Sequence, residues 1–188
     1  MTTRAAYAPD DWAVLRRLVP EVAEAMRIAG PSGPGGRFLE ERAGRAAQER
    51  SLGRLASVEL IADLQAAHAS DGPPAFSADP RADGAAFLDA TLADADRARV
   101  ILAAVATPGE AEAYRSLVMD VGEGVATAAG EPGSSAKVSD GERALLGRLA
   151  AALGAEGYEP PHKVDSPFGD YRDTGAAERD LYGEDPTR

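Results

Sequence analysis

Apolar residues recur at every third or fourth position through most of this chain, and this spacing constrains the fold more than any other feature. The clearest case starts at Thr107, where Pro108 and Glu110 complete the pattern of a capped helix start. A stripe then follows that would lie on one face of an α-helix. It consists of Tyr114, Leu117, Val118, Val121 and Val125. Strand-like alternation is almost absent, so we predict an all-α protein.

The same spacing, with its breaks, predicts the layout of the chain. Helices are expected from Asp10 or Asp11, over 37–69 with a break near Ser51 or Gly53, over 85–106, from Pro108, and from Ser139 to Gly154. Loops are expected at 30–36, 70–84 and 130–137, and Pro20 should kink or split the first helix. We therefore predict a compact bundle of about five to seven helices over 1–157, with an extended C-terminal tail over 158–188.

The composition excludes several classes of function. The 31 acidic residues exceed the 20 basic ones, giving a net charge of −11, which disfavours nucleic acids and anionic membranes. The chain has no cysteine, so disulfides and thiolate metal sites are excluded. No secretory signal and no stretch of roughly 20 apolar residues is present. We expect a soluble cytoplasmic protein without membrane insertion, and the sequence leaves a homo-oligomer open.

An acidic turn precedes the last predicted helix, in the stretch KVSDGERALLGRLAAALG over 137–154. Ser139 and Glu142 have the spacing of a capping box, and Gly154 stands where a left-handed helix end belongs. The alternative is a Ca²⁺ or Mg²⁺ loop that uses Asp140 and Glu142. Because the alternating ligands of an EF-hand loop are missing, the cap is the favoured interpretation.

Residues 110–154 resemble the closing helical pair of TerB-like domains, a helical family associated with tellurite resistance. The shared pattern is a tyrosine-bearing helix that is rich in alanine at its end, a glycine-rich loop, then V-S-x-x-E and a short leucine helix. The resemblance implies a helical fold. It also implies divalent-metal binding by acidic residues near helix starts, which here are Asp140 and Glu142.

Three further carboxylates fall on apolar helix faces. Asp94 lies in the middle of the stripe of the 85–106 helix, and Glu59 and Asp63 share a face with Leu52 and Leu55. A buried carboxylate is costly unless it is paired or bound to a cation. Convergence of Glu59, Asp63 and Asp94 would suit a divalent ion. Alternatively, each acid lies at the edge of its stripe in water or pairs with Arg54 or Arg97.

The tail carries apolar side chains among acids, in a segment that cannot form its own core. These residues are Phe168, Tyr171, Leu181 and Tyr182, and we expect them to contact a protein partner. The leading hypothesis is therefore a non-enzymatic, TerB-like binding or scaffold protein with no cofactor. The alternative is a divalent-metal-binding stress-response protein. An enzyme with an unrecognised carboxylate site is a third hypothesis, disfavoured by the poverty of histidine and the lack of cofactor motifs.

Overall fold

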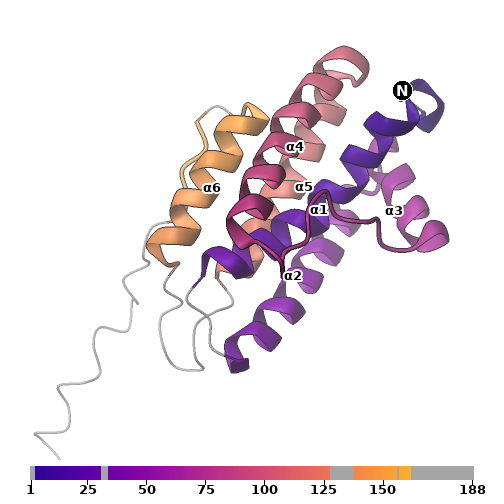
Figure 1. The fold of residues 1–188 in the computed structure, drawn as a ribbon. Helices are drawn as coiled ribbons and strands as arrows, with labels where there is room; N and C mark the ends of the chain where they lie inside the picture. Colours follow the sequence, from indigo (N-terminus) through magenta and orange to yellow (C-terminus); the bar gives the residue numbers. More distant parts are fainter. Residues whose placement is uncertain (1–2, 31–33, 128–137, 156, 162–188) are drawn as a thin grey trace, which may run out of the picture.

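The computed structural model describes residues 3–30, 34–127, 138–155 and 157–161, and these residues form an all-helical bundle (Figure 1). A short 3-10 helix, η1 (Arg4–Ala6), precedes the bundle. The helices are α1 (Pro9–Ala29), α2 (Pro34–Arg54), α3 (Glu59–Asp71), α4 (Gly84–Val105), α5 (Pro108–Ala126) and α6 (Asp140–Leu153). The predicted fold class is confirmed, and the six α-helices of the described residues fall within the expected number.

Helix α1 begins two or three residues earlier than a cap at Asp10 or Asp11 would place it. Ala8 is the N-cap and Pro9 takes the first helical position, where its fixed φ suits the helix and its missing N–H costs nothing. The prediction of an aspartate cap is wrong. Both aspartates instead lie in the first turn, next to the positive end of the helix dipole. Pro20 lies inside α1 and does not split it.

The predicted stretch 37–69 is two helices, as the break near Ser51 or Gly53 indicates. The break itself comes slightly later, between the end of α2 at Arg54 and the start of α3 at Glu59. The loop prediction for 30–36 is wrong at its end, because α2 already begins at Pro34. This proline stands at the first helical position, like the proline that opens α1.

The position of this break changes which residues share a face. Leu52 belongs to α2, Leu55 lies in the connecting turn, and Glu59 is the first residue of α3. The predicted common face of Leu52 and Leu55 with Glu59 and Asp63 is therefore wrong, because helical phase does not carry across a turn that interrupts the helix. Glu59 and Asp63 themselves are four positions apart in α3 and do share a face.

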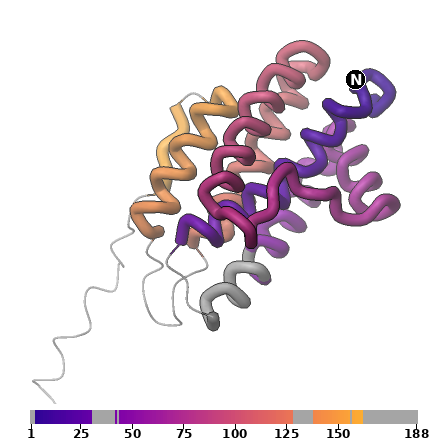
Figure 2. Tube along the Cα trace, viewed as in Figure 1, coloured from indigo at the N-terminus to yellow at the C-terminus, as the bar shows by residue number. Residues whose placement is uncertain are grey.

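Helix α5 lies at the centre of the bundle and contacts every other α-helix. Its predicted stripe is buried, including Tyr114 and Val118, which are fully enclosed. A Cβ on Gly122 would lie 3.0 Å from Leu146 of α6 and 3.3 Å from Val22 of α1. Glycine therefore lets α1 and α6 approach α5 closely. The trace in Figure 2 shows α4 running alongside α6, with which it is also in contact.

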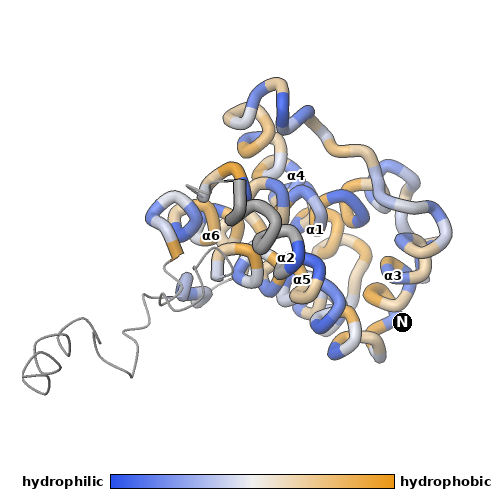
Figure 3. Tube along the Cα trace, turned by 90° about the horizontal axis from the view of Figure 1, so that it is seen from below, coloured by the Kyte–Doolittle hydropathy of each residue, from blue (hydrophilic) through white to orange (hydrophobic). Residues whose placement is uncertain are grey.

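Hydrophobic and hydrophilic segments alternate along the helices (Figure 3), as expected for amphipathic helices around a shared core. No helix in the described part of the chain is long and apolar enough to cross a membrane. After α6, Tyr158 packs against the core, and Pro161 lies in a pocket with Arg54 and Glu123. The chain thus still follows the bundle at 158–161, beyond the predicted start of the tail.

Candidate functional site

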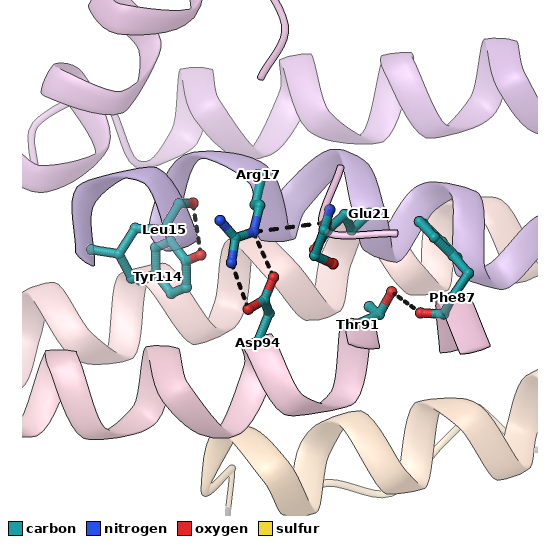
Figure 4. Close-up of polar contacts among 8 residues, drawn as sticks. Leu15, Arg17, Glu21, Phe87, Thr91, Asp94 and Tyr114 are labelled. Atoms are coloured by element: carbon teal, nitrogen blue, oxygen red, sulfur yellow. Dashed lines mark hydrogen bonds and ion pairs between the residues drawn. The ribbon is translucent and has the colours of Figure 1, made fainter. Parts of the chain in front are cut away.

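Asp94 of α4 is buried, as its helical phase predicts, with 7% of its surface exposed. Its partner is Arg17 of α1. The Nε of Arg17 donates to Oδ2 of Asp94 at 2.6 Å, and Nη2 donates to Oδ1 at 2.8 Å (Figure 4). The sequence alternative named Arg54 and Arg97 as partners, but these two arginines pair with other acids, Asp120 and Asp11 respectively.

Glu21 joins the same pair and has no solvent exposure at all. Its Oε1 accepts a hydrogen bond from the backbone N–H of Ser77 at 2.6 Å and lies 3.8 Å from Nε of Arg17. Its Oε2 is buried without a partner among the described residues. We call Arg17, Glu21 and Asp94 the buried ionic cluster. It ties α1 to α4 and to the segment that precedes α4.

The cluster holds two carboxylates against one guanidinium, and this imbalance affects the pKa of Glu21. Burial raises that pKa above its usual value, and the charge of Asp94 raises it further, while the hydrogen bond from Ser77 opposes the rise. Tyr114 lies beside the cluster and donates its hydroxyl proton to the carbonyl of Leu15 at 2.8 Å (Figure 4). Burial raises the pKa of Tyr114 well above its usual value.

The sequence analysis did not identify Arg17 or Glu21, although the phase of α1 contains a signal for the second. Val14, Leu18 and Ala25 are fully buried, and Glu21 follows Leu18 by three positions and precedes Ala25 by four. Glu21 therefore lies on the buried stripe of the helix. No comparable signal marks Arg17, which reaches the cluster from the edge of the stripe.

The predicted acids of α3 are placed apart from this cluster by their own contacts. Asp63 accepts a hydrogen bond from the backbone N–H of Arg4 at 2.8 Å, and Glu59 opens α3 with one buried, unpartnered oxygen. In the part of the chain that the structure describes, no three His, Cys, Asp or Glu side chains are grouped so as to hold a metal ion. Metal binding by Glu59, Asp63 and Asp94 stays a prediction.

The acidic turn before α6 is a capping box. The Ser139 backbone N–H donates to Oε2 of Glu142 at 2.8 Å, and the Glu142 N–H donates to the Ser139 hydroxyl at 3.2 Å. Asp140 is exposed and pairs with Arg143 at 3.4 Å. Gly154 ends the helix in the left-handed conformation, with φ +69°. The cap interpretation is confirmed, and metal binding by Asp140 and Glu142 stays a prediction of the resemblance alone.

A surface pocket that the sequence analysis missed lies at the start of α1. It has a volume of about 600 Å³, and we call it the N-terminal pocket. Two aromatic rings form part of its wall, those of Tyr7 and Trp12, with centroids 5.7 Å apart and planes tilted by 43°. Helix η1 turns the chain back so that Tyr7 meets α1. The pocket is lined by Arg4, Ala5, Tyr7, Pro9, Trp12, Ala13 and Arg16.

Both charged residues that line this pocket are arginines. The guanidinium of Arg4 lies 5.8 Å from the centroid of the Trp12 ring, a cation–π geometry. Arg16 is tied to α3, because it pairs with Asp71 at 3.1 Å and donates to two backbone carbonyls at the end of that helix. Arg4 therefore carries the cationic group that is more available to a ligand.

The aromatic residues of the N-terminal pocket hold unused polar atoms. The hydroxyl of Tyr7 and the indole nitrogen of Trp12 are buried without hydrogen-bond partners among the described residues. Burial raises the pKa of Tyr7 to about 12, and the nearby charges of Glu110 and Asp63 add to the rise. Tyr7 therefore stays a neutral donor at physiological pH. Trp12 itself is buried, and the helical spacing of α1 gives no sign of the pocket beside it.

The predicted partner-binding residues Phe168, Tyr171, Leu181 and Tyr182 lie outside the described residues. Comparison of the chain with protein-family models, curated proteins and solved structures found no match. The resemblance of residues 110–154 to TerB-like domains therefore stays a prediction, and functional inference depends on the geometry of this chain.

Proposed function

We propose that this protein is a non-enzymatic helical binding protein whose N-terminal pocket receives an apolar side chain from an acidic segment of a protein partner. The observation that carries the proposal is the lining of the pocket. Two aromatic residues, Tyr7 and Trp12, offer an apolar surface, and both charged residues among the described lining are arginines. Aromatic residues and arginine are the side chains most enriched at the energetic centres of protein interfaces.

The arginines of the lining, and not the charge of the whole protein, give the pocket its preference for acids. The net charge is −11, so the general field disfavours acidic partners. A partner segment with carboxylates around an apolar side chain would gain a local ion pair with Arg4 that a neutral segment would not. An aromatic anchor that buries roughly 150 Å² contributes about 4 kcal/mol. Because association itself costs several kcal/mol, this anchor needs the ion pair with Arg4 beside it, and we expect weak binding of a short peptide.

The buried ionic cluster supports a structural interpretation better than a catalytic one. Arg17, Glu21 and Asp94 line none of the pockets described above. Arg17 pairs with both carboxylates, one on its own helix α1 and one on α4. A general acid must come within hydrogen-bond reach of a substrate. The cluster therefore holds the bundle together and positions α1, on which the N-terminal pocket is built.

Trp12 gives a direct test, because it is the one tryptophan of the chain and it lines the pocket. Synthetic peptides with a single Leu, Tyr or Phe between Asp and Glu residues are titrated while Trp12 emission is followed. We expect saturable changes with these peptides, and at least tenfold weaker binding for peptides in which Lys replaces the acids. Equal binding of both series would refute the acidic specificity, and no saturable change with any peptide would refute the proposed site.

A further inference from the structure

We propose that residues 179–185 of the same chain, with the sequence RDLYGED, occupy the N-terminal pocket and compete there with an external partner. This inference rests on the proposed function, since it names an internal ligand for the same site. The segment is outside the described residues. Its sequence, the lining of the pocket and the length of chain between them support the proposal.

The chemistry of the segment matches the lining of the pocket. Leu181 and Tyr182 offer two adjacent apolar side chains, and they are flanked by Asp180 on one side and by Glu184 and Asp185 on the other. In the pocket, Tyr7 and Trp12 offer apolar walls for Leu181 and Tyr182, and Arg4 offers a positive charge for the carboxylates.

The length of chain favours this segment over the earlier apolar pair at Phe168 and Tyr171. Pro161 lies against the C-terminal half of α5, in a pocket with Glu123 and Thr127. The charge of Glu110, in the first turn of α5, acts on Tyr7 of the N-terminal pocket. The rise of the helix from Glu110 to Glu123 is about 20 Å.

That separation sets how far along the chain the occupant must lie. The seven residues from Pro161 to Phe168 span at most about 24 Å when fully extended. This barely exceeds the straight-line separation, so the chain could not follow the longer path around the protein surface. The twenty residues to Leu181 span up to about 66 Å. A domain of about 160 residues has a radius of gyration of about 15 Å, so this length suffices to pass around the bundle to the pocket.

An internal ligand of this kind weakens the binding of an external one by a calculable factor. A connection of this length gives an effective concentration of the order of 1 mM. For an isolated heptapeptide that binds with a dissociation constant of about 0.1 mM, the pocket would be occupied from within about ten times as often as it is free. We therefore expect the full chain to bind an external peptide about tenfold more weakly than a chain whose segment is disabled.

The experiment titrates three full-length proteins with the synthetic peptide RDLYGED while Trp12 emission is followed. The proteins are the natural chain, the double variant Leu181→Ala/Tyr182→Ala, and the matched control Phe168→Ala/Tyr171→Ala. We expect the first variant to bind the peptide about tenfold more tightly than the natural chain, and the control to behave like the natural chain. The emission of the natural chain should not depend on protein concentration, because the contact is intramolecular.

Each other outcome overturns a distinct statement. Equal dissociation constants for the natural chain and Leu181→Ala/Tyr182→Ala would refute the internal ligand while leaving the pocket intact as a site for partners. Tighter binding by the Phe168→Ala/Tyr171→Ala control would identify the other segment as the occupant and refute the choice of 179–185. Emission that changes with protein concentration would show docking between two copies. No binding of this peptide or of any other acidic peptide to any of the three proteins would refute the proposed function itself.

Discussion

Arg17 of α1 and Asp94 of α4 form a two-point ion pair across 77 positions of sequence, with donor–acceptor distances of 2.6 and 2.8 Å. The pair explains why an aspartate occupies the apolar face of α4. It fixes the orientation of α1 relative to α4, and α1 in turn carries Trp12 and Arg16 into the wall of the N-terminal pocket. The geometry of the N-terminal pocket therefore depends on the ion pair, because α1 takes part in both.

Removing Asp94 should be costly, because Arg17 loses two short hydrogen bonds and keeps only Glu21, at 3.8 Å. We expect Asp94→Asn to lower the free energy of unfolding by about 3 kcal/mol, measured by urea denaturation. Asp96→Asn is the matched control, since Asp96 lies on the same helix and pairs with Arg99 in an exposed position. That variant should change stability by less than about 0.5 kcal/mol. Similar effects of the two substitutions would contradict a buried pair.

The raised pKa of Glu21 predicts a pH dependence with a definite sign. Between its usual pKa of 4.5 and its higher value in the folded protein, Glu21 binds more protons when folded than when unfolded. Its contribution to stability therefore falls as the pH rises through that window. Glutamine mimics the protonated acid at all pH values. We expect the stability of Glu21→Gln relative to the natural protein to increase from pH 4 to pH 7.

Urea denaturation at several pH values measures this difference, and Glu24→Gln supplies the control. Glu24 lies on the same helix but is partly exposed and pairs with Arg27. Its substitution should not give a difference that grows in favour of glutamine as the pH rises. A pH-independent difference for Glu21→Gln would show that burial does not hold the proton on this carboxyl group.

Gly141 should tolerate no side chain, in contrast to another glycine of α6. A Cβ at Gly141 would lie 2.6 Å from the backbone oxygen of Ala29, at the end of α1. Because the backbone cannot give way as a side chain does, we expect Gly141→Ala to destabilise the protein by about 1–3 kcal/mol. Gly147→Ala meets nothing within 4 Å and should stabilise the protein by up to about 1 kcal/mol. Thermal melts of both variants measure the contrast, and equal effects would contradict the close contact of α1 with α6.

A thermal melt in EDTA and then in Ca²⁺, Mg²⁺ or Mn²⁺ tests the metal hypothesis. Arg17 already neutralises Asp94, and Asp63 accepts a hydrogen bond from the backbone of Arg4. We therefore expect no ion-specific rise in melting temperature. A rise of several degrees with one ion, lost in Asp63→Asn but kept in the exposed variant Asp96→Asn, would restore the metal hypothesis for these acids.

The sequence predicted the helical fold and placed Asp94 on an apolar helix face, because both depend on periodicity within one helix. It predicted the capping boxes at Thr107 and Ser139, because a cap involves residues three positions apart. It did not predict Arg17 as the partner of Asp94, since that pairing depends on how two distant helices pack. The N-terminal pocket was not predicted for the same reason. It forms because Tyr7 folds back onto Trp12, and no local sequence pattern specifies that contact.

The proposed function is tested most directly by the effect of Arg4 on the binding of an acidic peptide. Trp12 emission is titrated with one Asp-flanked tyrosine peptide in the natural protein, in Arg4→Gln and in Arg81→Gln, whose arginine is exposed and outside the pocket. We expect Arg4→Gln to weaken binding about fivefold or more, as loss of about 1 kcal/mol of ionic and cation–π interaction implies. The Arg81→Gln variant should bind like the natural protein. Equal affinities for all three proteins would contradict the account.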